Sequence, residues 1–286
     1  MKAHDINIRD PFILLDGGKY YLYGSRGQEL WGACTGLDVY VSEDLMEWSA
    51  PIPAFERPAD FWADRNFWAP EVHRYNGKYY MLATFKSESR HRGTQILRAD
   101  SPLGPFLPHS DGPVTPQDWS CLDGTLYVED GVPYMIFCHE WSQIRDGEMC
   151  CVPLTADLSA PAGEVRILFK ASSLPSGSDR VNDGFITDGP FLYRTKSGRL
   201  LMIWSSFDET GYVEAVSFSE SGSVLGPWRH CETPLSAEDG GHGMLFTDKS
   251  GTLRFTMHSP NHPRCAERVR IFPMRETEAE PFLEFM

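Results

Sequence analysis

Several features that would define a protein class at once are missing from this sequence of 286 residues. None of its seven cysteines forms a CxxC pair, and Cys150 and Cys151 are sequence neighbours, so neither a disulfide framework nor a zinc site is indicated. No apolar run approaches the roughly 20 residues that cross a bilayer. We therefore expect buried thiols and no association with a membrane.

The sequence also lacks an excess of positive charge. It has 26 Lys and Arg against 40 Asp and Glu, which gives a formal net charge of −14 at pH 7. That sign opposes binding to a phosphate backbone, so we expect no nucleic-acid partner. Linkers and low-complexity segments are missing as well, which predicts a single domain over residues 1–286.

The N-terminus lacks the apolar segment of a secretory leader. The compartment therefore depends on Met1: the protein is cytoplasmic if Met1 is native, and periplasmic or secreted if a leader was removed before it. We expect a monomer.

Turn formers and aromatic residues are abundant. The sequence contains 25 Gly and 21 Pro, and 13% of its residues are aromatic. This composition is typical of an all-β protein with many turns and is far from that of a disordered chain.

The sequence repeats one plan five times: a short apolar strand that begins with a polar or proline-containing motif, a turn centred on glycine, and an aromatic-rich second strand. The turn glycines are Gly18, Gly77, Gly131, Gly198 and Gly251, so successive gaps are 59, 54, 67 and 53 residues. Further strand-like runs between these hairpins bring each repeat to about four antiparallel strands. A two-sheet sandwich gives no reason for the motif to restart five times, whereas radial repetition of small sheets is a β-propeller. We expect five blades around a central funnel.

The first strand of each propeller blade lines the central channel, so the residues at its start converge on one spot. From blade one to blade five we expect these positions to hold Asp10, then Trp68 with Ala69 and Pro70, then Asp123, Asp188 and His242. Glycoside hydrolysis needs one ionised carboxylate to activate water and one protonated carboxyl to protonate the leaving oxygen. Crowded carboxyls in a partly desolvated site separate their pKa values in this way. With aromatic faces near the strand ends, the pattern predicts a carbohydrate substrate.

These segments resemble glycoside hydrolase family 43 over nearly the whole chain. The likeness is carried by RDPF from Arg9, WAPEV from Trp68, LDGTLYVEDGVPY around Asp123, TDGPFLY around Asp188 and GHG around His242. It implies an inverting propeller enzyme that acts on arabinose- and xylose-containing polysaccharides. It further implies that Asp10 is the general base, that Asp123 orients the acid and modulates its pKa, and that Asp188 is the general acid.

Asp188 departs from the family pattern, which has Glu in an EGP motif where this chain has TDGP. Aspartate is one methylene shorter and about 0.4 pKa unit more acidic when unperturbed, so it must lie closer to the leaving group. Glu140 is the second candidate for the acid, with Glu71 behind it.

Substrate contacts are expected from a wider set around the funnel, namely Trp68, Ala69, Glu71, Trp141, Trp204, His242 and Arg268. No cofactor is expected to be required. The resemblance to arabinan-cleaving members also implies a calcium ion in the central channel, held through water by His242. Calcium takes six to eight oxygen ligands and no D-x-D-x-D loop supplies them here, so such an ion would be mostly hydrated.

The leading hypothesis for function is an exo-acting α-L-arabinofuranosidase on plant polysaccharide or oligosaccharide side chains. A β-D-galactofuranosidase, a β-xylosidase and an endo-arabinanase of the same fold remain open, as does a propeller that binds sugar without catalysis. A glycoside phosphorylase is disfavoured because no Arg or Lys cluster beyond Arg9 is evident at the strand starts to hold phosphate.

Overall fold

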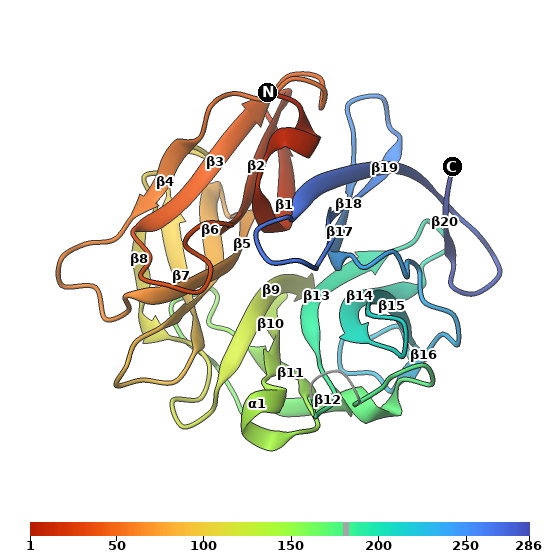
Figure 1. Cartoon of the computed structure of the whole chain (residues 1–286). Helices are drawn as coiled ribbons and strands as arrows, with labels where there is room; N and C mark the ends of the chain where they lie inside the picture. Colours follow the sequence, from red (N-terminus) through yellow and green to blue (C-terminus); the bar gives the residue numbers. More distant parts are fainter. Residues whose placement is uncertain (180–182) are drawn as a thin grey trace.

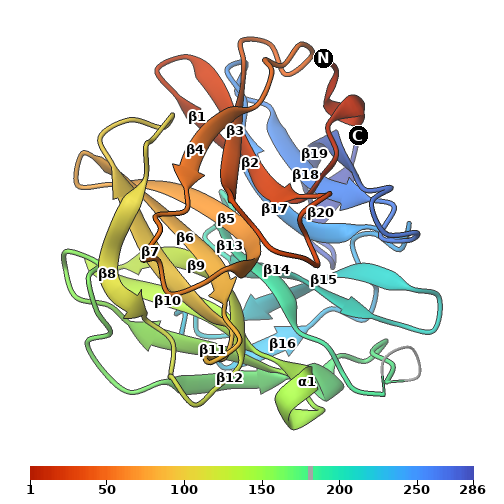
Figure 2. The same cartoon turned by 60° about the vertical axis from the view of Figure 1, so that its left-hand side comes forward.

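The computed structural model describes residues 1–179 and 183–286, which form five four-stranded antiparallel sheets (Figure 1). Each sheet consists of four strands that are consecutive in the chain. The innermost strands, one from each sheet, contact one another in a closed ring, and the sheets radiate from it as blades (Figures 1 and 2). The predicted all-β, five-bladed propeller is confirmed.

The strands divide evenly among the blades. Blade I contains β1 (Ile8–Asp16), β2 (Lys19–Arg26), β3 (Gly36–Ser42) and β4 (Ile52–Glu56). Blade II contains β5 (Arg65–Tyr75), β6 (Lys78–Lys86), β7 (Gly93–Ala99) and β8 (Leu107–Pro113). Blade III contains β9 (Cys121–Glu129), β10 (Val132–His139), β11 (Glu148–Pro153) and β12 (Arg166–Lys170). Blade IV contains β13 (Asp188–Arg194), β14 (Leu200–Phe207), β15 (Tyr212–Ser219) and β16 (Trp228–His230), and blade V contains β17 (Gly241–Thr247), β18 (Leu253–Ser259), β19 (Arg268–Glu276) and β20 (Leu283–Phe285).

Within residues 1–179 and 183–286, helical structure is confined to three short segments. They are the α-helix α1 (Trp141–Ile144) and two 3-10 turns, η1 (Ala3–Asp5) and η2 (Ala171–Ser173). Among the described residues, no helix has the length and apolar character needed to span a membrane.

The hairpins between the first two strands of each blade turn at the predicted glycines. All five have a left-handed backbone, with φ between 76° and 89°, at Gly18, Gly77, Gly131, Gly198 and Gly251. Residues with a side chain rarely adopt this conformation, which explains why glycine recurs at the same place in every repeat.

Every blade also has an irregularity where its first strand reaches the ring. The first two strands pair there through Arg9 and Ser25, Trp68 and Thr84, Leu122 and Cys138, Asp188 and Ser205, and Gly241 and His258. The residue after each first-strand member has positive φ: Asp10 (56°), Ala69 (46°), Asp123 (57°), Gly189 (46°) and His242 (52°). Such bulges re-aim a side chain, and here the bulges of blades I, III and V bring Asp10, Asp123 and His242 to the central cavity.

The bulges are tied from blade to blade by hydrogen bonds. A side chain on the second strand of one blade accepts the backbone N–H of the next blade's bulge residue. The pairs are Ala69 N to Ser25 Oγ (2.8 Å), Asp123 N to Thr84 Oγ1 (2.9 Å), His242 N to Ser205 Oγ (2.7 Å) and Asp10 N to His258 Nδ1 (3.3 Å). The positions of the axial side chains are therefore fixed by neighbouring blades.

Blades I and V close the ring through side chains, because each is built from one end of the chain. Asn7 Nδ2 donates to the backbone oxygens of Cys265 (3.0 Å) and Glu267 (2.8 Å). Beside them, Arg9 forms an ion pair with the fully buried Glu267 (3.2 Å).

Candidate active site

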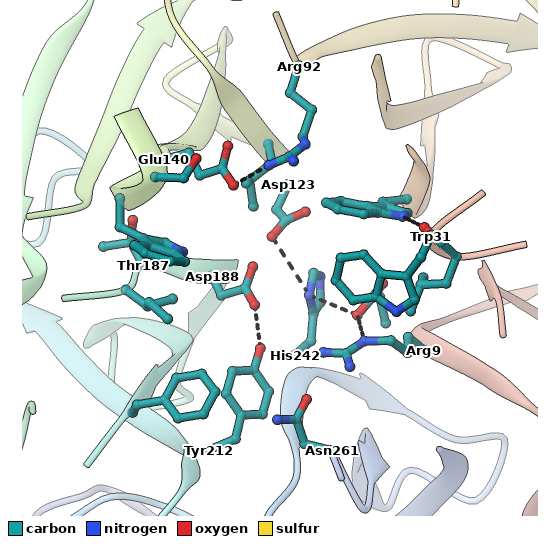
Figure 3. Close-up of a pocket in the computed structure, with 18 of the residues that line it drawn as sticks. Arg9, Trp31, Arg92, Asp123, Glu140, Thr187, Asp188, Tyr212, His242 and Asn261 are labelled. Carbon is teal, nitrogen blue, oxygen red and sulfur yellow. Dashed lines mark hydrogen bonds and ion pairs between the residues drawn. The ribbon is translucent and has the colours of Figure 1, made fainter. Parts of the chain in front are cut away.

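A cavity of about 500 Å³ lies at the centre of the ring (Figure 3). All five blades line it, through Asp10, Trp68, Asp123, Asp188 and His242 among others. A volume of this size falls within the roughly 300–1,000 Å³ of small-molecule sites. The predicted convergence of strand-start residues is therefore observed.

Asp188 occupies a different register from the other axial residues. It pairs with Ser205 just as Arg9 pairs with Ser25, so it lies one residue before the bulge, whose position in blade IV is held by Gly189. The expectation that Asp188 is equivalent to Asp10 and Asp123 is wrong by one residue. Because of this offset Asp188 is half-buried, whereas Asp10 and Asp123 are buried beneath it.

Asp10 lies among positive groups. His242 Nδ1 is 3.3 Å from Asp10 Oδ1, Arg9 Nε is 3.8 Å from the same oxygen, and the Ser25 hydroxyl donates to Oδ2 at 2.5 Å. Burial alone would raise the pKa of Asp10, but His242, Arg9, His258 and the Ser25 hydrogen bond together lower it. Burial holds the pKa of His258 well below its usual value, so Arg9 is the permanent cation of the group. Asp10 is therefore ionised at neutral pH.

Asp123 and Asp188 form a carboxyl pair next to His242. One ligand atom from each of the three residues lies within 4.8 Å of the others. The pKa of Asp123 is raised well above its usual value by burial, by the charge of Asp188, by a hydrogen bond with Asp188 and by the charge of Asp10. Gly189 N–H donates to Asp123 Oδ2 at 3.1 Å and fixes that oxygen. Two carboxyls this close retain a proton between them at a pH where an isolated aspartate is ionised.

Glu140 lines the same cavity but has both oxygens engaged. Arg92 forms an ion pair with Oε1, and the Ser120 hydroxyl donates to Oε2 at 2.7 Å. The Arg92 guanidinium also lies 4.7 Å from the centre of the Trp68 ring. These contacts favour a role for Glu140 in shaping the cavity wall over one in proton donation.

Aromatic side chains form part of the wall. Trp31, Trp68 and Trp141 line the cavity, and Trp31 packs edge-to-face on Trp68 at 5.2 Å. Trp31 is 52% exposed and carries the Arg264 guanidinium 4.5 Å above its ring. Exposed indole faces beside a polar floor suit the apolar face of a sugar ring.

The cavity holds more cations than the sequence indicated, since Arg92 and Arg264 line it in addition to Arg9. These two arginines come from loops, and so lie outside the strand starts, where no Arg or Lys cluster beyond Arg9 was expected. Arg9 and Arg92 are each paired with a carboxylate, Glu267 and Glu140 respectively, so these two are not free to clamp phosphate.

Two predicted contact residues lie away from the cavity. Glu71 is buried on β5, where its Oε2 lies 2.9 Å from His73 Nε2. Trp204 is fully buried in the core shared by blades III and IV, with its indole N–H donating to Ser217 Oγ. Both predictions as substrate contacts are wrong, because the Glu71 carboxylate is engaged by His73 of its own strand and the Trp204 ring packs in the core between blades III and IV.

Arg268 and Ala69 do not line the cavity either. Arg268 donates to the backbone oxygens of Cys265 (3.4 Å) and Glu267 (2.8 Å) and so braces the loop before β19. Ala69 occupies the blade II bulge, where its N–H binds Ser25, the residue that also holds Asp10. Ala69 thus acts on the site through its backbone.

The donor set does not fit a directly bound calcium ion. His242, Asp123 and Asp188 would offer two carboxylates and one imidazole nitrogen, whereas calcium takes six to eight oxygens. His242 Nδ1 already faces Asp10 at 3.3 Å and Asp123 at 3.8 Å. The water-held calcium ion stays a prediction, and no chemical step is derived through it.

Three polar residues near the cavity were not identified from the sequence. They occupy equivalent positions at the third strands of their blades. In blades II, IV and V, one residue of the third strand pairs with Thr84, Ser205 or His258 of the second strand. The residue two positions before that partner is Arg92 in blade II, Tyr212 in blade IV and Glu267 in blade V. Aligning the third strands of the repeats would have placed them together. Asn261, His262 and Arg264, in the loop after β18, also line the cavity.

The sequence matches the family described as Glycosyl hydrolases family 43 over residues 5–283. It is similar to the crystal structure of an endo-arabinase from Bacteroides thetaiotaomicron VPI-5482, with a TM-score of 0.90, 39% identity and coverage of 98% of both chains. It is 24% identical over 249 residues to extracellular endo-alpha-(1->5)-L-arabinanase 1 of Bacillus subtilis (strain 168), covering 82% of this chain and 71% of that protein. It is 27% identical over 225 residues to a non-reducing end alpha-L-arabinofuranosidase of Bacteroides ovatus, covering 77% of this chain and 38% of that protein. The chain therefore belongs to glycosyl hydrolase family 43 and is a glycosidase.

Proposed function

We propose that this glycosidase hydrolyses α-L-arabinofuranosyl linkages with inversion of the anomeric carbon. The observation that carries the mechanism is the placement of two unlike carboxyl sites in one cavity, with Asp10 beside Arg9 and His242 and with Asp123 beside Asp188. Asp10 is held ionised by Arg9 and His242, whereas the Asp123 and Asp188 pair retains a proton. An ionised base and a protonated acid are what a single displacement by water requires.

In this mechanism Asp10 removes a proton from a water molecule, whose oxygen attacks the anomeric carbon. Asp188 gives its proton to the departing glycosidic oxygen, and Asp123 restrains that proton until the bond breaks. The imidazole of His242 contacts both groups: its Nδ1 lies 3.3 Å from Asp10 Oδ1, and one of its nitrogens lies within 4.8 Å of an Asp188 carboxyl oxygen. Base and acid are thus kept apart, which favours a water between them and inversion over a covalent intermediate.

The substrate class is supported by the relatives whose names specify arabinan or arabinofuranosides. Two of these names specify endo action, so cleavage within α-1,5-linked arabinan is the first candidate. Exo release of terminal arabinofuranose is the second candidate. It is favoured by Trp31 and Asn261 from loops of blades I and V and by Trp141 from α1 of blade III, which all line the cavity.

The substrate experiment compares linear arabinan, an aryl α-L-arabinofuranoside, an aryl β-D-xyloside and an aryl β-D-galactofuranoside. We expect arabinan and the arabinofuranoside to be cleaved. Chromatography of early products separates the modes: a ladder of oligosaccharides indicates endo action, and arabinose alone indicates exo action. Cleavage of the xyloside or galactofuranoside in preference to both arabinose substrates would contradict the proposal.

The acid is identified by comparing Asp188→Asn with Glu140→Gln on a good and a poor leaving group. General acid catalysis contributes roughly 10²- to 10⁴-fold, and aryl leaving groups need little of it. We expect Asp188→Asn to lose that factor on arabinan and to lose much less on the aryl glycoside. The same selective loss in Glu140→Gln, with Asp188→Asn unaffected, would transfer the role to Glu140.

A further inference from the structure

A buried phenol touches the carboxyl of Asp188. The hydroxyl of Tyr212, the first residue of β15, donates to Asp188 Oδ2 at 2.6 Å (Figure 3). Tyr212 is 1% exposed. Burial raises its pKa well above the usual value for tyrosine, so the phenol keeps its proton and remains a donor.

The phenol ring has little freedom to leave this contact. It stacks on His258 at 5.8 Å and packs against Phe207 at 5.0 Å. On the side of blade V it abuts Gly241, where an added Cβ would lie 2.6 Å from Tyr212 Cε1. The direction of the hydroxyl is therefore set by three neighbouring elements.

A fully buried carboxyl lies two residues farther along the same strand. Glu214 Oε2 accepts the Ser205 hydroxyl (2.9 Å) and Gly243 N–H (3.2 Å), and Oε1 has no hydrogen-bond partner within residues 1–179 and 183–286. Burial raises the pKa of Glu214 to about 8, so this group is mainly neutral at pH 7. Glu214 therefore adds little negative charge near Asp188 at neutral pH.

Hydrogen bonding to one carboxyl oxygen determines where the other oxygen carries its proton. With Oδ2 occupied by the Tyr212 donor, the transferable proton belongs on Oδ1. We propose that Tyr212 is the positioning residue of the acid, holding Asp188 so that its protonated oxygen faces the departing group. This inference rests on the proposed function, and it explains how an acid one methylene shorter than glutamate is held in place.

Several charged or titratable groups face Asp188 from the elements around it. They are Arg9 on β1, Asp123 on β9, Cys138 on β10, Tyr212 and Glu214 on β15, and His242 on β17. Within the described residues, Tyr212 is the member of this set that donates a hydrogen bond to Asp188 Oδ2.

The test is Tyr212→Phe, which removes the hydroxyl and keeps the ring. We expect kcat on a poor leaving group, such as α-1,5-arabinobiose, to fall roughly 10- to 100-fold, with little change on 4-nitrophenyl α-L-arabinofuranoside, because only the first needs the acid. A donated hydrogen bond favours the ionised carboxylate. Its loss should therefore move the alkaline limb of the pH–rate profile to higher pH.

Two outcomes would overturn the inference. An equal loss on both substrates would mean that Tyr212 only supports the fold. An alkaline limb that stays in place or moves to lower pH would mean that Tyr212 does not donate to the acid. Retained cleavage of the aryl substrate shows that the variant is folded, so every result bears on the role.

Tyr193→Phe is the matched control. Tyr193, on β13 of the same blade, donates to Glu276 Oε1 at 2.7 Å and does not line the cavity. We expect its variant to behave as wild type on both substrates. Failure of the proposed function would appear separately, as wild type inactive on both arabinosides. The two failures are therefore distinguishable.

Discussion

At the scale of the residue, the site contains carboxyls in different charge states because their neighbours differ. Asp10 faces a guanidinium and two imidazoles, whereas Asp123 faces another carboxyl. Glu214 is fully buried and accepts hydrogen bonds from neutral donors, the Ser205 hydroxyl and the Gly243 N–H. The same functional group is thus ionised or protonated according to what lies within a few ångströms.

Glu214 makes stability depend on pH. Its folded pKa of about 8 lies above its unfolded value of 4.5, so the folded state binds more protons between these limits and stability falls as pH rises through them. Glu214→Gln removes this dependence. We expect the variant to gain relative to wild type by a few kcal/mol between pH 5 and pH 9, at about 1.4 kcal/mol per pKa unit.

Thermal or urea unfolding of both proteins across that pH range measures the difference. Glu278→Gln, an exposed glutamate, serves as the control and should run parallel to wild type. A constant offset between Glu214→Gln and wild type at all pH values would show that Glu214 is not buried as a neutral group.

At the scale of the element, the bulge that begins each blade determines which residue faces the axis. In blade IV that residue is Gly189, with φ of 46°. A Cβ there would lie 2.6 Å from the His242 ring. The absence of a side chain at Gly189 therefore lets His242 approach Asp123.

Gly189→Ala should displace His242 and the acid pair. Misplacement of about 1 Å can cost roughly 100-fold in rate, and we expect a loss of that order in kcat/KM. Gly198→Ala in the same blade is the control, since it also has positive φ (89°) but has no atom within 4 Å of an added Cβ. Equal activity of the two variants would contradict the steric role of Gly189.

The repeat made the blades predictable, because hairpin glycines and aromatic second strands recur at similar spacing. The register of Asp188 was not predicted, because TDG and LDG place Asp before Gly in both blades III and IV. The prolines hold the correct signal: Pro11, Pro70 and Pro190 each follow a bulge residue. Glu71 and Trp204 were misplaced because strand position alone does not say which face of a sheet a side chain occupies.

At the scale of the whole molecule, closure of the ring determines whether Asp10 meets the other four blades. Blades I and V come from opposite ends of the chain and share no sheet. They meet through Asn7, through the Arg9 and Glu267 ion pair and through the Asp10 N–H bond to His258. These contacts form the seam between blades I and V. Both the stability of the ring and the position of Asp10 in the site depend on them.

Asn7→Ala removes two hydrogen bonds across the seam. We expect a loss of roughly 1–2 kcal/mol in the free energy of unfolding, since a net hydrogen bond contributes about 0.5–1.5 kcal/mol. Ser221→Ala removes local hydrogen bonds to Gly226 O, Ser223 N–H and Ser219 Oγ within blade IV, and it should cost less because the first two are exposed to water. Urea unfolding compares them, and a greater loss in Ser221→Ala would contradict the importance of the seam.

The central claim is that Asp10 and the Asp188 pair act on opposite sides of one bond, with water as the nucleophile. Proton NMR of the first sugar released from an α-L-arabinofuranoside tests it most directly. With inversion, β-L-arabinofuranose appears first and then mutarotates. Initial appearance of the α anomer would indicate a retained configuration and a covalent intermediate, and would contradict the assignment of Asp10 as a base acting on water.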